Sequence, residues 1–315
     1  MDFTIRNFDP ETDIPALAAL ESLCESSPVT EDEMRNQDSK WGSESVRCRL
    51  VATLADGRVC GYAEAGRRVH VKPGQFRIWV IVAREMRLQG IGALLYQKVH
   101  EFALANRATF YKSQVRDNDP LALRFAEKRG FNVTRHKFES VLALETFDSS
   151  RFAGVVETLQ AEGIRFFSFA DTNGSEEDQR KLYEINTLLG HDVPGNELES
   201  VRPFEQFAAD VFGGHWFQPD GQIFAAVGDR LIGLGAAGII HPGVGYNLMT
   251  GVLREYRGRG IALALKLLCI EFCQKHDLKS IRTHNDSQNQ SILAINRKLG
   301  YRAEPGWFTL RCDLE

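Results

Sequence analysis

Two segments of the 315-residue chain, one starting at Val82 and the other at Val252, share the same sequence pattern. The segment that starts at Val82 reads VAREMRLQGIG, and the segment that starts at Val252 reads VLREYRGRGIA. The register between the two copies continues without a gap as far as Gly300. A turn shared by chance would not keep its register for so long. The repeat therefore predicts two similar domains of ordinary size, residues 1–147 and 160–315.

Each copy predicts a strand, a basic turn with glycines, and the start of a helix. Glycine removes the Cβ atom where a ligand must approach the backbone, and the first amides of a helix have no partner inside it. A phosphate group can accept hydrogen bonds from such amides. Arg254, Arg257 and Arg259 add charged donors at the same place. We therefore expect an anion-binding turn in each half.

Composition excludes several classes of protein. Hydrophobic residues make up 43% of the chain and charged residues 25%, which is typical of a soluble globular protein, and the apolar runs are too short to span a membrane. A net charge of -4 gives no general attraction to nucleic acid. The chain opens directly into a strand-like segment, which indicates no signal peptide. The 6 cysteines form no Cys-x-x-Cys pair and have no histidine at zinc spacing, which predicts reduced thiols, no metal site and a cytoplasmic location.

Both halves predict the same order of elements: a strand, two helices, a hairpin, a strand, the glycine turn with its helix, a strand, a helix and a closing strand. Residues 144–163 lie between the two series and are expected to join them.

This order, with the turns Arg87–Gly92 and Arg257–Ala262, resembles the GNAT acetyltransferase superfamily, in its tandem-domain form. Asn285 and Asn289 stand where the family has its later asparagines. The resemblance implies an α/β (α+β) fold of two tandem acyl-CoA N-acyltransferase domains, each a mixed, mostly antiparallel sheet flanked by helices. It implies acetyl-CoA as acyl donor, no metal, and transfer to a primary amine of a small molecule by direct attack in a ternary complex.

In the family, the strand before the turn exposes backbone groups to the pantetheine arm, and one of its amides, here that of Val252 or its neighbour, polarises the thioester carbonyl. The resemblance thus implies two sets of cofactor-binding residues. In the second half these are Val252, Leu253, Arg254, Arg257, Gly258, Arg259, Gly260, Ile261, Ala262, Asn285, Asn289 and Asn296, and in the first half Val82, Ala83, Arg84, Arg87, Leu88, Gln89, Gly90, Ile91 and Gly92.

The chain departs from the family in its acid and base groups. Many members carry a tyrosine that protonates the leaving thiolate, where this chain has Asn296 in the second half and an alanine in the first. The thiolate then leaves unprotonated or takes its proton from water. For the proton of the amine, His284, Glu205 and a water relay ending on Tyr246 all remain open. Val252, His284 and Asn285 are the expected catalytic set, although an ordinary surface residue is the alternative for His284.

The second half is the expected catalyst because it keeps the three asparagines, whereas the first half is expected to bind acyl-CoA or to act as a scaffold. The resemblance implies acceptor contacts from the first two helices, between Glu176 and Val211, and from the closing strands, between Pro305 and Leu314, where aromatic residues would form an apolar wall. The aromatic residues expected in that wall are Trp216, Phe217, Trp307 and Phe308. Core packing is the alternative for each of these aromatic residues and the preferred one for Phe308. Two alternatives stay open: a non-catalytic acyl-CoA-binding or regulatory protein, and a protein N-acetyltransferase. We expect a monomer or homodimer with a small-molecule partner and neither nucleic acid nor membrane.

Overall fold

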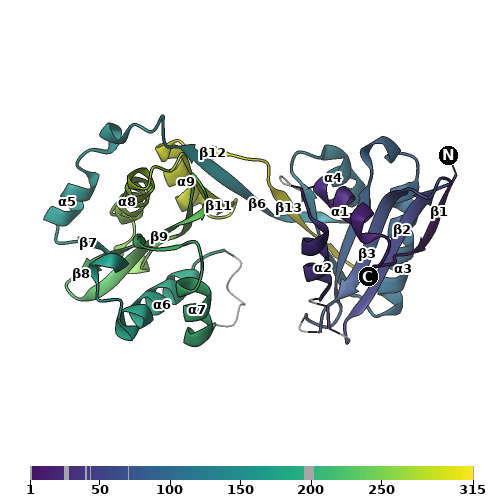
Figure 1. The fold of residues 1–315 in the computed structure, drawn as a ribbon, viewed down its shortest axis with the longest axis horizontal. Coiled ribbons are helices and arrows are strands. Elements are labelled where there is room, and N and C mark those ends of the chain that lie inside the picture. The colour runs from purple at the N-terminus through teal and green to yellow at the C-terminus, as the bar shows by residue number, and fades with distance from the viewer. Residues whose placement is uncertain are drawn as a thin grey trace. The chain divides into compact units, whose positions relative to one another are not determined.

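A computed structural model describes residues 2–24, 28–39, 41–42, 44–69, 71–194 and 202–314. The chain forms two compact units (Figure 1). The first unit contains Met1–His136 together with Trp307–Glu315, and the second contains Lys137–Gly306.

The first unit is a mixed sheet with the strand order β1-β2-β3-β4-β5-β13. Its strand pairs are antiparallel except for β4 with β5. The elements, in chain order, are β1 (Phe3–Asn7), α1 (Ile14–Ser22), α2 (Glu31–Ser39), β2 (Val46–Leu54), β3 (Val59–Arg67), β4 (Gln75–Val82), η1 (Arg84–Met86), α3 (Ile91–Ala105), β5 (Phe110–Arg116), α4 (Pro120–Glu127) and β13 (Trp307–Asp313).

The second unit repeats this plan with the strand order β7-β8-β9-β10-β11-β6, and the short β12 also pairs with β6. Among the strand pairs described for this unit, β10 and β11 are parallel. The elements are β6 (Asn132–Ala143), η2 (Ser149–Phe152), α5 (Val155–Ala161), β7 (Arg165–Ser168), η3 (Phe169–Asp171), α6 (Glu176–Gly190), α7 (Phe204–Phe212), β8 (Phe217–Val227), β9 (Arg230–His241), β10 (Val244–Val252), η4 (Arg254–Tyr256), α8 (Ile261–Lys275), β11 (Ser280–Asp286), α9 (Gln290–Leu299) and β12 (Arg302–Ala303). The mixed, mostly antiparallel sheets flanked by helices confirm the expected fold class.

The closing strands are exchanged between the two halves of the sequence. Strand β13, from the end of the chain, pairs with β5 of the first unit, and β6, from the end of the first half, pairs with β11 of the second (Figure 1). The two units therefore differ from the expected ranges 1–147 and 160–315 by one strand each. The physical reason is that backbone hydrogen bonds between strands do not depend on the side chains. Two closing strands with a similar pattern of apolar residues can therefore pair with either sheet edge.

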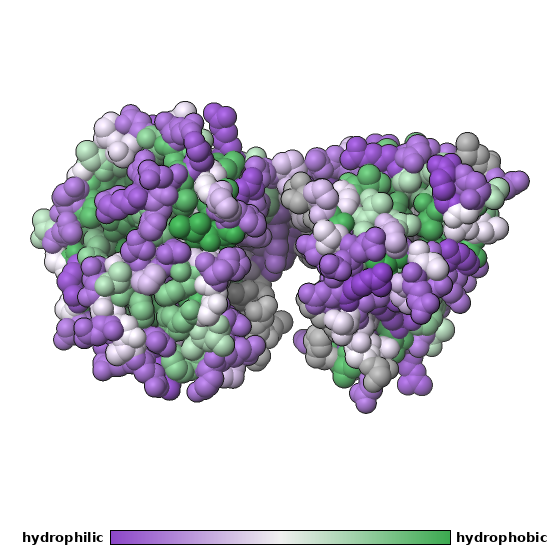
Figure 2. Space-filling view, viewed as in Figure 1, coloured by the Kyte–Doolittle hydropathy of each residue, from purple (hydrophilic) through white to green (hydrophobic). Residues whose placement is uncertain are grey.

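The buried side chains follow the exchange. Leu310 of β13 has no exposed surface and belongs to the core of the first unit, whereas Leu142 of β6 belongs to a core of the second. The segment expected to join the domains also packs into the second unit, because Phe152 and Leu159 are buried in that same core. Hydrophilic residues cover much of the visible face of both units, with apolar residues in groups among them (Figure 2).

The helices cover both faces of each sheet. In the first unit, α3 buries Ile91, Leu95 and Val99 against strands β2 to β4. In the second unit, α8 lies over one core and α6 and α7 over another. Each glycine turn therefore leads from a central strand into the helix that covers one face of its sheet.

A lysine is fully buried inside the second unit. Lys266 of α8 is only 2% exposed, donates from Nζ to Asn247 Oδ1 at 2.6 Å, and lies 5.0 Å from the centre of the Tyr301 ring. Burial lowers its pKa from 10.5 to about 8, because the charged form loses its hydration. Asn247 lies at a register shift of β10, so the lysine secures an irregular part of the strand.

The strand exchange makes a testable prediction about where core mutations act. Leu310→Ala should cost about 2–5 kcal/mol and raise hydrogen exchange at residues 110–116, because it leaves a cavity beside β5 of the first unit. Leu142→Ala is the matched control and should raise exchange at residues 280–286 instead. If Leu310→Ala loosened residues 280–286, the exchange of strands would be wrong.

Lys266 predicts how stability depends on pH. Its folded pKa lies below its unfolded value, so between pH 8 and pH 10.5 the unfolded chain binds more protons and stability rises with pH. We expect the free energy of unfolding of the wild-type chain to rise by roughly 3 kcal/mol over this window relative to Lys266→Met. Denaturant titrations at several pH values measure it. Equal slopes for the two chains would contradict the prediction.

Candidate functional site

A fork in the sheet is the first feature of the site in the second unit. Strands β10 and β11 pair in parallel only from Val244 to Tyr246, where Tyr246 faces Arg282. Beyond this point β10 continues to Val252 and β11 to Asp286 without pairing to each other. The fork leaves one side of β10 open to an extended ligand.

The first unit has the same fork. Strands β4 and β5 pair only from Gln75 to Arg77, yet β4 continues to Val82 and β5 to Arg116. The fork is therefore a feature of the repeat, and it occurs at the same place relative to each glycine turn.

Backbone amides at the end of each forked strand point in alternate directions. Leu253 donates its amide to Ile232 on β9 at 2.8 Å, so the amide of its neighbour Val252 faces the open side. In the first unit Ala83 donates to Cys60 at 2.9 Å, which turns the amide of Val82 to the fork. Of the expected backbone donors, the amides of Leu253 and Ala83 are thus already used within the sheet.

The glycine turns leave helix amides without side-chain caps. Gly90 and Gly260 precede α3 and α8 in left-handed conformation, with φ of 87° and 88°, and in the described chain neither helix has a side-chain cap. A Cβ added at either glycine would meet nothing within 4 Å, so the space in front of the amides is open. Such an N-terminus fits a phosphate group.

One turn position is strained in the first unit. Leu88 has φ of 63°, and Gly258, its equivalent, has φ of 79°. The left-handed conformation costs a residue with a Cβ about 1–2 kcal/mol. The first turn keeps it without a glycine, with Leu88 itself 88% exposed.

The arginines brace the turns. Arg257 Nε donates to the Val252 carbonyl at 2.9 Å, and Arg87 Nε donates to the Val82 carbonyl at 3.2 Å. This bond closes the turn onto the strand before it. The sequence suggested phosphate contacts for both arginines, which stay predictions.

The arginines of the second turn form ion pairs with carboxylates of the same unit. Asp192 pairs with both Arg254 and Arg257, and the two guanidinium groups hold the pKa of this carboxyl below its usual range. Arg259 pairs with Glu162 at 2.9 Å. An incoming diphosphate would meet Asp192 where it needs the two arginines.

A cavity of about 710 Å³ lies along the fork and turn of the first unit. It is within the size range of ligand sites. Six of the residues expected to bind the cofactor line it: Val82, Arg84, Arg87, Leu88, Gly90 and Gly92. Three others lie elsewhere, because Ala83 and Ile91 are buried in the core and the side chain of Gln89 donates to the Glu85 carbonyl.

The asparagines expected at the cofactor are linked inside the second unit. Asn285 Nδ2 donates to Ser140 Oγ at 2.9 Å and Asn296 Nδ2 donates to Asn285 Oδ1 at 2.7 Å, and both asparagines are buried. Asn289 caps α9 by accepting from the Ile292 amide at 3.3 Å. These contacts tie β11 to β6 and α9. Contact with a cofactor stays a prediction for all three.

The structure brings two of the base candidates together with a residue that the sequence did not indicate. Tyr246 donates its hydroxyl to Glu139 Oε1 at 2.8 Å, and His284 Nδ1 lies 3.5 Å from the same oxygen. Glu139 Oε2 accepts from Arg282 at 2.8 Å. Glu139 belongs to the exchanged strand β6, so no signal in the repeat connects it with His284. Glu205 lies on α7 and is not part of this cluster.

Two of the four aromatic residues considered for the apolar wall of the second half lie in the first unit, and Phe308 packs there, as the alternative given for it states. Trp307 and Phe308 lie on β13 in the first unit, where Trp307 contacts the ring of Trp79 at 5.8 Å between centroids and Phe308 contacts that of His136 at 4.7 Å. The exchange of the closing strands is the reason.

Two kinds of feature are absent from the described part of the chain. No described helix combines the length and apolarity needed to cross a membrane. Among the same residues, no group of three or more His, Cys, Asp or Glu side chains could hold a metal ion. The buried thiols are packing residues, and burial raises the pKa of Cys269 to about 12.

Comparison with known proteins agrees with the duplicated fold. Residues 14–131 and 182–301 each match the sequence model of the acetyltransferase (GNAT) family, so the chain belongs to this family, whose members are N-acetyltransferases that use acetyl-CoA. A mycothiol acetyltransferase from Geodermatophilus obscurus is 22% identical over 261 residues, which are 80% of this chain and 78% of that protein.

Two solved structures share the fold over nearly the whole chain. A GCN5-related N-acetyltransferase from Sphaerobacter thermophilus has a TM-score of 0.65 at 20% identity and covers 99% of this chain and 95% of its own. A tandem GNAT protein from the clavulanic acid biosynthesis pathway has a TM-score of 0.63 at 18% identity, covering 99% and 98%. Both are similar to this chain in having its complete two-unit fold.

Asp192 makes a prediction about the second turn. Asp192→Asn removes the carboxylate that competes for Arg254 and Arg257, so acetyl-CoA should bind the second unit several-fold more tightly and with a steeper dependence on salt. Calorimetry at two salt concentrations measures both. Asp210→Asn, which removes an exposed partner of Arg202 instead, is the control. Weaker binding by Asp192→Asn would show that the carboxylate supports the turn.

Proposed function

We propose that the protein transfers an acetyl group from acetyl-CoA to a primary amine of a small molecule by direct attack in a ternary complex, with a reaction centre in the second unit. The observation that carries this proposal is the cluster of Tyr246, Glu139 and His284 at the base of the fork. There the sheet opens, and a thioester arm lying along β10 would end beside these side chains.

The donor site is built from backbone groups. The open amides at the start of α8 and the glycine at position 260 fit a diphosphate, and the open side of β10 fits the pantetheine arm. The Val252 amide faces the fork at the turn end of β10, six residues and about 20 Å along the strand from Tyr246. We therefore assign it to the part of the pantetheine arm next to the diphosphate, and the thioester itself to the base of the fork. When bound, acetyl-CoA supplies an activated acyl group.

The cluster can handle the proton of the amine. We assign His284 as the base, because its ring is 71% exposed and its Nδ1 lies next to Glu139. A carboxylate beside one ring nitrogen orients the ring and leaves the other nitrogen to face the substrate. Tyr246 and Arg282 hold the Glu139 carboxylate in place through their hydrogen bonds.

In the second unit we assign no side chain to protonate the departing thiolate, so it takes its proton from water. Asn296 stands where many relatives carry a tyrosine acid, is buried, and donates to Asn285. An amide cannot supply a proton at neutral pH. A thiolate with a pKa near 8.5 leaves without such an acid. The mycothiol acetyltransferase relative supports the class of reaction, and at 22% identity it does not carry its substrate over.

A variant series tests this reaction centre. His284→Ala should lower kcat by about 10²–10⁴-fold, which is the usual contribution of a general base, with little change in acetyl-CoA affinity. Glu139→Gln should give a smaller loss. His276→Ala, which changes a histidine of the same unit that pairs with Asp220, is the matched control. CoA thiol release measures the rates, and full activity in His284→Ala would refute the assignment.

A further inference from the structure

A second, smaller cavity adjoins the donor cavity of the first unit. It has a volume of about 210 Å³, equal to about seven water molecules of the liquid. Trp79, Gln114 and Trp307 line both cavities, so the two spaces share a wall at the fork. The smaller cavity is also lined by residues of α1 and α2, including Glu21 and Asp38. It therefore lies where a molecule would meet the acyl end of a donor.

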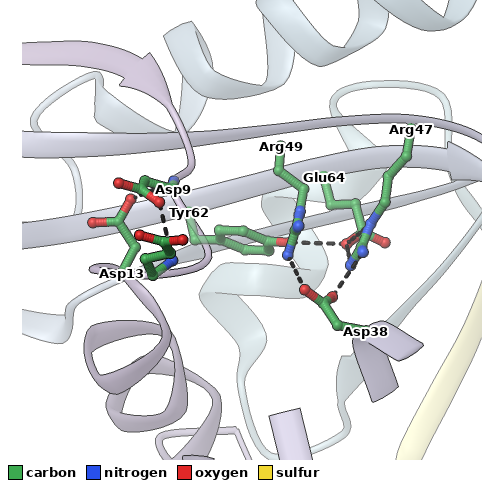
Figure 3. A network of polar contacts seen from close by, with 8 residues as sticks. Asp9, Asp13, Asp38, Arg47, Arg49, Tyr62 and Glu64 are labelled. Atoms are coloured by element: carbon green, nitrogen blue, oxygen red, sulfur yellow. Dashed lines mark hydrogen bonds and ion pairs between the residues drawn. The ribbon is translucent and has the colours of Figure 1, made fainter. Parts of the chain in front are cut away.

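A buried carboxylate lines this cavity with one oxygen unpaired. Glu64 of β3 is 4% exposed, and its Oε2 accepts from Tyr62 Oη at 2.8 Å and from Arg47 Nε and Nη2 at 3.0 and 2.6 Å (Figure 3). No donor among the described residues hydrogen-bonds to Oε1. Oε1 is not among the fully buried side-chain atoms that lack a partner in the described chain, so it is reached from the cavity and can accept from a ligand that donates.

The positive charges of the cavity are divided into two groups. Arg47 is neutralised by Asp38 and Glu64, and Arg49 also pairs with Asp38 (Figure 3). Arg68 and Arg77 also line the cavity, but within the described chain neither has a carboxylate partner. Each lies over a tryptophan ring instead, Arg68 at 5.1 Å from Trp41 and Arg77 at 5.0 Å from Trp79.

A purely structural ion network neutralises its charges within itself. In this cavity, Asp38 and Arg47 neutralise each other. One carboxylate oxygen of Glu64 has no hydrogen-bond donor among the described residues, and the guanidinium groups of Arg68 and Arg77 have no carboxylate partner there. The remaining groups match a ligand that has both a donor cation and an anion. A guanidinium binds a carboxylate through two parallel hydrogen bonds, and a carboxylate binds an ammonium group.

We propose that this cavity is a second acceptor site, which binds and acetylates a small molecule with a primary ammonium group and a carboxylate, an amino acid or a molecule ending in one. The ammonium group donates to Glu64 Oε1, next to the Trp79 ring. The carboxylate binds Arg68 and Arg77. This site goes beyond the reaction centre of the second unit and does not depend on it.

The transfer uses acetyl-CoA in the donor cavity of the same unit. One ammonium proton passes to Glu64 and on to solvent, and the amine nitrogen then forms a bond with the acetyl carbon. The bond between that carbon and sulfur breaks, and the second proton of the nitrogen goes to the sulfur through water. The products are an N-acetylated amino acid, free CoA and one proton.

Binding and turnover by the full-length chain test this site. Calorimetry without acetyl-CoA would compare each of the twenty L-amino acids with the amine that lacks its carboxylate. We expect at least one amino acid to bind at least tenfold more tightly than its amine, and mass spectrometry to find its N-acetyl product when acetyl-CoA is added. If no amino acid binds below about 10 mM Kd, the proposal is overturned.

Variants locate the site. Arg68→Gln and Arg77→Gln should each weaken amino-acid binding at least tenfold and leave binding of the matched amine unchanged, because only the carboxylate is recognised there. Glu64→Gln should weaken both ligands. Arg67→Gln changes the neighbouring arginine of β3, which does not line the cavity, and is the control. Circular dichroism checks that each variant folds.

The second unit is tested separately in parallel. Amino-acid acetylation that is lost in His284→Ala but survives in Arg68→Gln and Arg77→Gln would assign this substrate to the second unit and overturn the present proposal. Acetylation that is lost in the two arginine variants supports it, whatever His284→Ala does to other amines.

Discussion

The early end of one parallel strand pair is the constraint on which both sites depend. In each unit the central strands share only three paired positions, Gln75–Arg77 with β5 and Val244–Tyr246 with β11, and then separate. Unpaired backbone groups on a strand are unfavourable unless something binds them. The unpaired strand edge at the fork can therefore hydrogen-bond to an extended ligand that has its own amides. The glycine turn at the end of the fork provides helix amides that can bind a phosphate group.

The exchanged closing strands determine which residues reach each fork. Glu139 comes from β6 and meets Tyr246 and His284 in the second unit, whereas Trp307 comes from β13 and lines the cavities of the first. Each site thus contains a residue encoded in the opposite half of the sequence. A site assembled in this way requires both halves of the chain, because neither half alone encodes all of its side chains.

Both units pair the equivalent arginine of the turn, Arg87 or Arg257, with a carboxylate, and they differ in what lies beside the turn. In the second unit, carboxylates neutralise the arginines of the turn, as Asp192 does for Arg254 and Arg257. In the first unit, Asp119 pairs with Arg87 at 2.7 Å, and the turn borders an open cavity of about 710 Å³ with a smaller polar cavity beside it. Duplication has kept the backbone geometry of the fork and the glycine turn and changed the side chains around them. This is expected where the main chain binds the donor and the side chains select the acceptor.

The sequence by itself determined the duplicated fold and the position of each turn, because glycine conformation and the pattern of apolar residues are local properties. Gly90 and Gly260 begin α3 and α8 as expected. Only the tertiary structure decided which closing strand enters which sheet, and with it the neighbours of Glu139 and Trp307. Backbone pairing between distant strands leaves no local trace in the residues that pair, so a repeat predicts the plan of each sheet but not the origin of its last strand.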